Sequence, residues 1–240
     1  MTSAEGRRDV LDDLAALGPF FAVETHRPGT GPTAPWRPLR ELTAAAGPLR
    51  TRIEAVRAAL AERASRPTAE IEPRVAASVT HLGLVARLIA PSVAAAASGR
   101  GLGMGLGELW WQDILGGPMP LSVPLPSAAA GDAPPVVHLL EEVIAPLTAA
   151  ASNLVTVSPR VLWGNVASAA NKAAALVAAR HPELSRPAWT AAAAVFATPW
   201  LSHERQPPGP HFRRSSCCLI YKVAANRPRS VCSDCVLRHG

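Results

Sequence analysis

All four cysteines of the chain lie within its last 24 residues, and their thiols are the groups best suited to chemistry. Cys217 and Cys218 are adjacent, and thirteen residues separate them from Cys232 and Cys235, which form a Cys-x-x-Cys pair. Four soft thiolates suit either a zinc ion or an iron–sulfur cluster. Zinc usually takes its ligands from two Cys-x2–4-Cys knuckles, and an adjacent pair does not make one. The spacing therefore favours a cluster over zinc.

The charge of the chain is concentrated around these thiols. Residues 203–240 contain seven basic and two acidic residues, which is +5 of the total net charge of +6. A [2Fe–2S] core held by four thiolates is anionic, so a cationic surrounding offsets its charge and favours its reduced form. Spacing and charge together predict a [2Fe–2S] cofactor with all four cysteines as its metal ligands, and zinc remains the alternative. The cations that could tune its potential or attract an anionic substrate are Arg213, Arg214, Lys222 and Arg229.

Other chemistries of these residues are disfavoured. A thioredoxin-like reaction of Cys232 and Cys235 needs a βαβ setting that the sequence lacks, and structural disulfides do not suit the cytoplasm. The glycine-rich run at residues 99–117 does not match a dinucleotide fingerprint, because the glycine required at the sixth position is missing. We therefore expect electrons to come from a partner protein.

Length and composition indicate a globular protein. The 240 residues are 48% hydrophobic and 18% charged, which excludes the composition of a disordered chain. Charged or polar residues interrupt the longest apolar stretches, 71–97 and 136–157, so we expect no membrane span. No signal peptide precedes the first helix, so we expect a cytoplasmic protein. We divide the chain into a mainly helical body, 1–202, with a possible break at 99–135, and a C-terminal segment, 203–240.

Apolar periodicity predicts a mainly α fold. Pro48 should break the helical pattern of residues 39–64, and Pro91 should end or kink the next helix near Ala90. Leu109–Asp113 and Met119–Val123 should form a small central β-hairpin, whose Trp110 and Trp111 either line a ligand groove or belong to the core. Further helices are expected over residues 8–17, 136–151, 158–180 and from 185 to before Pro199. The expected architecture is a helical body with this hairpin and a C-terminal cysteine-rich iron–sulfur tail.

The tail resembles a known family. The run from Arg213 to Tyr221, RRSSCCLIY, and the terminal Cys232-Ser233-Asp234-Cys235 are similar to the C-terminal signature of the FhuF-like ferric-siderophore reductases. A weaker similarity extends to residues 162–167, LWGNVA, and 86–91, ARLIAP. The thirteen-residue spacer is longer than is usual in that family, and an insertion at residues 224–229 would explain it.

The resemblance implies a function. Family members hold a [2Fe–2S] cluster on a Cys-Cys…Cys-x-x-Cys motif and pass one electron to a ferric siderophore, so that Fe(II) is released for iron assimilation. The expected partners are a ferric siderophore and an external electron donor, such as a ferredoxin or a flavin or NAD(P)H reductase. We expect no nucleic-acid partner, because Tyr221 is the only aromatic residue near the thiols. The alternative is a zinc-stabilised or iron–sulfur binding module without reductase activity, which binds a siderophore or an acidic partner.

Overall fold

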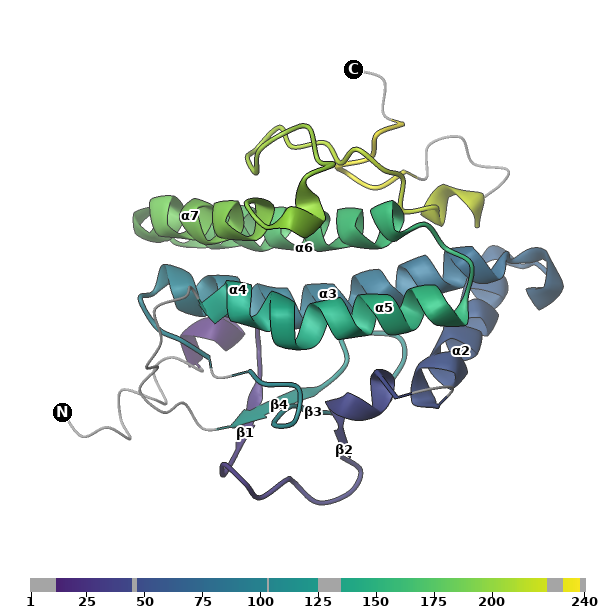
Figure 1. Cartoon of the computed structure of the whole chain (residues 1–240), viewed down its shortest axis with the longest axis horizontal. Helices are drawn as coiled ribbons and strands as arrows, with labels where there is room; N and C mark the ends of the chain where they lie inside the picture. The colour runs from purple at the N-terminus through teal and green to yellow at the C-terminus, as the bar shows by residue number, and fades with distance from the viewer. Residues whose placement is uncertain (1–11, 45–46, 103, 125–134, 224–230, 238–240) are drawn as a thin grey trace.

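The computed structural model describes residues 12–44, 47–102, 104–124, 135–223 and 231–237. Within these residues the protein is mainly helical and carries one small four-stranded sheet. Figure 1 shows α6 and α7 as one layer, α3 with α4 and α5 as the next, and the sheet with α2 beyond them. The C-terminal segment lies over α6, on the side of the bundle away from the sheet. The predicted mainly α fold is confirmed.

The helices begin where the sequence places its start signals. α2 spans Pro48–Ala64, so Pro48 opens this helix as its first residue and separates it from the 3-10 turn Leu39–Leu42. α6 spans Pro159–Arg180 and α7 spans Ser185–Phe196, as predicted. The expected helix at 136–151 is α4, Pro135–Leu139, then a π-helical turn, Leu140–Ile144, and α5, Ala145–Leu154. Residues 12–16 are helical; the start expected at residue 8 lies outside the described residues.

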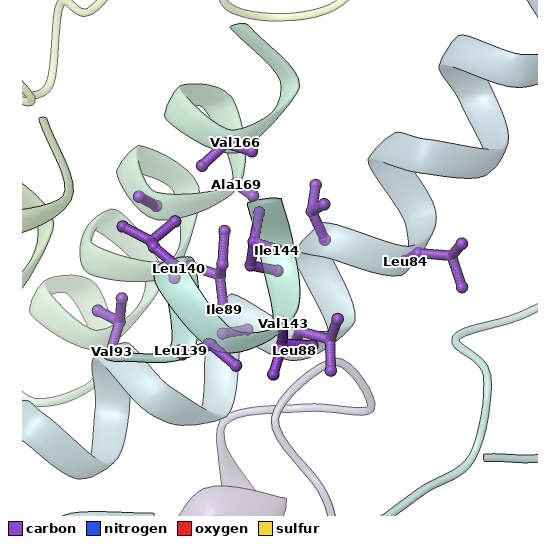
Figure 2. Close-up of a cluster of buried hydrophobic side chains, with 14 of the residues drawn as sticks. Leu84, Leu88, Ile89, Val93, Leu139, Leu140, Val143, Ile144, Val166 and Ala169 are labelled. Carbon is purple, nitrogen blue, oxygen red and sulfur yellow. The ribbon is translucent and has the colours of Figure 1, made fainter. Parts of the chain in front are cut away.

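α3, Pro73–Ala97, is the central helix of the fold. It packs most extensively against α6, and it also contacts α2, α4 and α7. The expectation that this helix ends near Ala90 is wrong, because Pro91 is buried inside a helix that continues to Ala97. An internal proline costs about 3 kcal/mol, and the packing of the helix on several sides outweighs that cost. Figure 2 shows part of this core, with Leu88 of α3 next to Val143 of the π-helical turn.

The length and composition of α3 alone would allow it to cross a membrane, but 72% of its most apolar window is buried inside the protein. That degree of burial is typical of a core helix. The absence of a membrane span therefore stays a prediction.

The predicted central hairpin belongs to a larger sheet. β3, Trp110–Trp111, pairs antiparallel with β4, Leu121–Pro124, as expected. The N-terminal region adds two strands that the sequence did not indicate: β1, Glu24–His26, lies parallel to β4, and β2, Arg37–Pro38, lies antiparallel to β3. These strands have only two or three residues, too few for an alternating pattern.

The two tryptophans of the hairpin differ in burial. Trp111 is fully buried in the core, beneath the guanidinium groups of Arg37 and Arg52. Trp110 is half-buried. The core alternative is therefore correct for Trp111.

Arg87 of α3 joins the sheet region to the helices. Its guanidinium group is buried and donates hydrogen bonds to the backbone carbonyls of Phe20, Ala22 and Met119. Burial lowers the pKa of Arg87 to about 10, so the side chain remains charged at neutral pH. One cation thus satisfies carbonyls from two segments that are distant in sequence.

Replacing Arg87 by Met should therefore lower the free energy of unfolding by about 3 kcal/mol, because one buried and two partly buried carbonyls lose their charged donor. Urea denaturation at neutral pH measures this change. Arg50→Met on the exposed face of α2 is the matched control and should change stability by less than about 0.5 kcal/mol. Equal stability of the two variants would show that these hydrogen bonds contribute nothing net.

Candidate functional site

The four cysteines come together in two cross-pairs. Cys218 Sγ lies 3.6 Å from Cys232 Sγ, and Cys217 is in hydrogen-bonding contact with Cys235. Electrostatic interactions also join Cys217 to Cys218 and Cys232 to Cys235. All four are free thiols. The fold therefore closes a ring of four sulfurs from two segments that are thirteen residues apart in sequence.

One member of each cross-pair is buried and the other is partly exposed. Cys218 and Cys235 are 2% and 1% exposed, whereas Cys217 and Cys232 are half-buried. The sulfur ring therefore has a covered side against the helices and an open side toward solvent. An electron-transfer centre needs such an open edge, because its partner must approach it.

Backbone N–H groups point at the sulfurs. Leu219 N lies 3.3 Å from Cys217 Sγ, and Leu237 N lies 3.3 Å from Cys235 Sγ. The Ile220 N–H interacts with Cys218 in the same way. Leu219 adopts the left-handed conformation, with φ of 68°, which turns the chain directly after Cys218. Such hydrogen bonds stabilise thiolates. When those thiolates ligate an iron–sulfur cluster, the same hydrogen bonds raise its reduction potential.

The two thiols of the Cys218–Cys232 pair differ in acidity. A hydrogen bond from Cys232 lowers the pKa of Cys218 to about 6, helped by the Ile220 N–H and the positive charge of Arg214. The same hydrogen bond, together with burial, raises the pKa of Cys232. Burial also raises the pKa of Cys217. Cys218 is therefore a stronger acid than Cys217 and Cys232.

Arg214 is a buried cation next to the Cys218 thiol, with 1% of its surface exposed. Its Nη2 donates to the Val161 carbonyl at 3.0 Å and to Asn165 Oδ1 at 2.9 Å. Its Nε and Nη1 are buried without a hydrogen-bond partner. A buried charge is costly unless it is compensated, and the Asp234 carboxylate and a thiolate at Cys218 both provide compensation. Because it is buried, Arg214 acts on the thiols through its charge and does not contact molecules that approach from solvent.

Hydrogen bonds extend from Arg214 through the helices to Cys218. Asn165 of α6 donates from Nδ2 to the Ser78 carbonyl at 3.0 Å. Ser78 of α3 donates from Oγ to the Cys218 carbonyl at 2.8 Å. Asn165 and Ser78 are fully buried. Two core helices thus fix the backbone at the first cysteine pair.

Asp234, inside the Cys-x-x-Cys pair, is the buried acid of the site. Burial raises its pKa, but the Ser168 hydroxyl, Lys172 and Arg214 outweigh that effect, and the net pKa is lowered. Lys172 Nζ lies 3.4 Å from Asp234 Oδ1, and the Arg214 N–H donates to the Asp234 carbonyl at 3.1 Å. The second cysteine pair is therefore tied to α6 and to residue 214.

Gly164 allows the tail to lie directly on α6. A Cβ at this position would come within 2.8 Å of Arg214 Nη2 and closer still to Ser216 Oγ. Next to it, Trp163 stacks on Trp200, with ring centroids 5.1 Å apart. The segment 162–167, marked in the sequence only by its resemblance, is thus the surface on which the tail docks.

Lys222 and Arg66 attach the tail to α2 and α3. Lys222 Nζ lies 2.6 Å from Glu72 Oε1, and hydrogen bonds from Lys222 and Arg74 lower the pKa of Glu72. Arg66 donates to the carbonyls of Lys222 and Val223. Lys222 is therefore engaged in an ion pair within the protein.

The remaining two predicted cations lie elsewhere. Arg213 is exposed, four residues before Cys217. Arg229, like the expected insertion at 224–229, lies outside the described residues.

Three residues that hold the tail in place were not predicted from the sequence: Ser78, Asn165 and Glu204. The Glu204 side chain is only 1% exposed, and it accepts a hydrogen bond from the Ser215 N–H at 2.7 Å.

The four thiols suit the [2Fe–2S] centre expected from the sequence, and zinc remains the alternative. Among the described residues, no three His, Cys, Asp or Glu side chains already form a group that could hold one metal ion. Two cross-pairs of thiols suit a core in which each iron takes two thiolates. Cys217, Cys218, Cys232 and Cys235 are the residues that would hold it.

No family model, curated protein or solved structure matches this chain. The argument for function therefore rests on the site itself.

Replacing Gly164 by Ala should lower the free energy of unfolding by about 1–3 kcal/mol, because the added methyl group overlaps the tail. Gly83→Ala in α3 is the matched control: its Cβ meets nothing within 4 Å, and it should be neutral or stabilising by up to about 1 kcal/mol. Urea denaturation measures stability, and hydrogen exchange at residues 214–219 reports tail docking. If hydrogen exchange at residues 214–219 is as slow in Gly164→Ala as in the wild type, the tail does not lie as close to α6 as the structure indicates.

Proposed function

We propose that this protein is a ferric-siderophore reductase that uses a [2Fe–2S] centre held by Cys217, Cys218, Cys232 and Cys235. The observation that carries the proposal is the convergence of all four thiols into one ring beside the buried Arg214, whose Nε and Nη1 lack partners. The resemblance of this segment to the FhuF-like reductases supports the same function.

Each group of the site has a part in this function. When bound, a [2Fe–2S] centre supplies one electron at a time. Arg214 and the N–H groups of Leu219 and Leu237 favour the additional negative charge of the reduced state. The half-buried Cys217 and Cys232 provide the edge at which partners approach.

The chemistry of the substrate requires neither a nucleophile nor a general acid. One electron converts Fe(III) to Fe(II), and a protein partner, such as a ferredoxin or a flavin-dependent reductase, replaces that electron. Catecholate and hydroxamate oxygens are hard ligands that hold Fe(III) much more tightly than Fe(II). Reduction therefore loosens the iron from its chelator.

The anaerobically purified protein should contain two irons and two sulfides per chain. Replacing any one of the four cysteines by Ser should bleach or strongly shift its visible spectrum, because an oxygen ligand replaces a soft thiolate. Metal analysis and absorption spectroscopy measure both effects. Stoichiometric zinc after iron-replete expression would contradict the proposal and favour a zinc-stabilised binding module. An unchanged spectrum in Cys217→Ser would show that this thiol is not a ligand.

Electron transfer should depend on the charge near the open edge. The chemically reduced protein should be reoxidised by ferric siderophores, and faster by anionic than by cationic chelates of similar driving force, because the tail carries most of the positive charge. Arg213→Gln should lower the rate with anionic chelates about twofold or more, and the difference should shrink as salt rises. Stopped-flow absorption measures the rates.

Arg180→Gln is the matched control, since this exposed residue ends α6 about 28 Å of helix away from Val161. That distance exceeds the Debye length of about 8–10 Å, so the rate should not change. The reduction potential of the centre is measured separately in each variant, because a lower potential would itself speed electron transfer to the chelate. No reoxidation by any ferric siderophore, with the centre intact, would overturn the reductase proposal.

A further inference from the structure

We propose that the cavity between α2, α3 and the loop at residues 115–119, here called the α2–α3 pocket, binds the electron acceptor, and that this acceptor is an anionic, aromatic, catecholate-type ferric chelate. The inference rests on the proposed reductase function and extends it to a binding site and a substrate class. The pocket encloses about 350 Å³. That volume lies within the range of about 300–1,000 Å³ typical of small-molecule sites.

The pocket is close to the sulfur ring. Val79 and Leu60 line it, and the same two side chains pack in the apolar cluster that contains Leu219 and Ile220. Leu219 directly follows Cys218 in the chain. From Ser78, which binds the Cys218 carbonyl, the pocket-lining part of α3 extends only to Leu84, about 9 Å along the helix. Side-chain contacts thus connect Leu219, the residue after Cys218, to the pocket wall.

The charges of the pocket favour an anion. Its described lining includes two arginines, Arg52 and Arg63, and no acidic residue. The Arg52 guanidinium is held by the Asp113 carboxylate and the Ile114 carbonyl, so its charge is partly neutralised. Arg63 is exposed in the last turn of α2 and supplies positive charge at the pocket.

A buried hydroxyl on the pocket wall lacks a partner. Thr80 is 4% exposed, and its Oγ1 forms no hydrogen bond. A buried polar group without a partner is unfavourable, but this oxygen has no accessible surface, so it offers no contact to a ligand in the pocket. The rest of the lining is mainly apolar and includes Phe20, Val56 and Leu84. Together with the positive charge of Arg63, this apolar lining suits flat aromatic rings that carry negative charge.

A second cavity is unsuited to this role. It encloses about 300 Å³ at the other end of α3 and α6, where Ser98 and Val177 line it together with the acidic Asp13 and Glu183. Ser98 is about 30 Å along the helix from Ser78. Electron transfer over that distance would be slow, and the two acids outnumber the one arginine of the lining, Arg100, so the cavity has no positive charge to attract an anionic chelate.

Binding can be tested without electron transfer. Gallium(III) tris(catecholate) is an anionic, redox-inert counterpart of the ferric complex, and calorimetric titration of the holoprotein measures its affinity. We expect binding to the wild type and to Thr80→Val, whose lost hydroxyl has no accessible surface. We expect weakening of about three- to tenfold in Arg63→Gln and loss of binding in Gly83→Phe. Gly83 lines the pocket, and a Cβ there meets no other atom within 4 Å, so a large side chain at this position would fill it.

The controls lie outside the pocket. Arg50→Gln and Ala58→Phe change exposed residues of α2 that do not line it, and both should bind the gallium complex like the wild type. The visible spectrum and the urea denaturation midpoint of every variant show whether the centre and the fold are intact. Thr80→Val is expected to be at least as stable as the wild type, because it removes an unpaired buried hydroxyl.

The outcomes separate this inference from the proposed function. If the wild type does not bind the gallium complex, or if Arg63→Gln and Gly83→Phe bind it like the controls, the pocket assignment is wrong, whether or not the protein reduces ferric chelates. If binding follows the expected pattern but the reduced holoprotein transfers no electron to the ferric complex, the pocket is a chelate-binding site and the reductase proposal fails. Binding of a cationic gallium trihydroxamate equal to that of the tris(catecholate) would overturn the substrate class.

Discussion

The buried guanidinium of Arg214 is the constraint on which the site depends. The hydrogen bonds from its Nη2 to Val161 and Asn165 hold the tail on α6. Its positive charge lies beside the Cys218 thiol. A cation with 1% exposure requires both hydrogen-bond acceptors and a nearby anion. The docking of the tail is therefore linked to the charges beside Arg214, which are the Cys218 thiol and the buried Asp234 carboxylate.

α3 contacts the tail, the α2–α3 pocket and the sheet region. Near its N-terminal end, Ser78 holds the backbone of the first cysteine pair, and in its second half Arg87 holds the carbonyls of the sheet region. Between these two positions, Val79 and Thr80 face the α2–α3 pocket. Because one helix carries all of these contacts, the thiols, the pocket and the sheet have a fixed relation to one another.

The positive charge of the tail lies in two different settings. Arg214 and Lys222 form contacts inside the protein, one next to a thiol and the other in an ion pair with Glu72. Arg213 lies at the surface. The net charge of the segment therefore combines cations that hold the tail on the helices with a cation that is exposed to solvent.

The sequence by itself determined the helical architecture and the identity of the reactive groups. Pro48 and the pair Ser158-Pro159 mark helix starts by local rules, because proline lacks an N–H and suits a first turn. The four thiols are recognisable because they are the only soft ligands of their kind and are confined to one short segment. The central hairpin was likewise visible, since a local turn connects its strands.

Only the tertiary structure decided the rest. Pro91 remains inside α3 because packing outweighs its local cost, and β1 joins β4 through a pairing almost one hundred residues apart, marked by the 2.8 Å hydrogen bond between His26 and Ser122. Ser78 and Asn165 look like ordinary polar residues of apolar helices until the tail is placed on them. The pocket arises from two helices and a loop that share no sequence signal. The physical reason is common to these cases: local sequence rules describe bonds within a few residues, whereas burial, charge compensation and close approach depend on which distant segments meet.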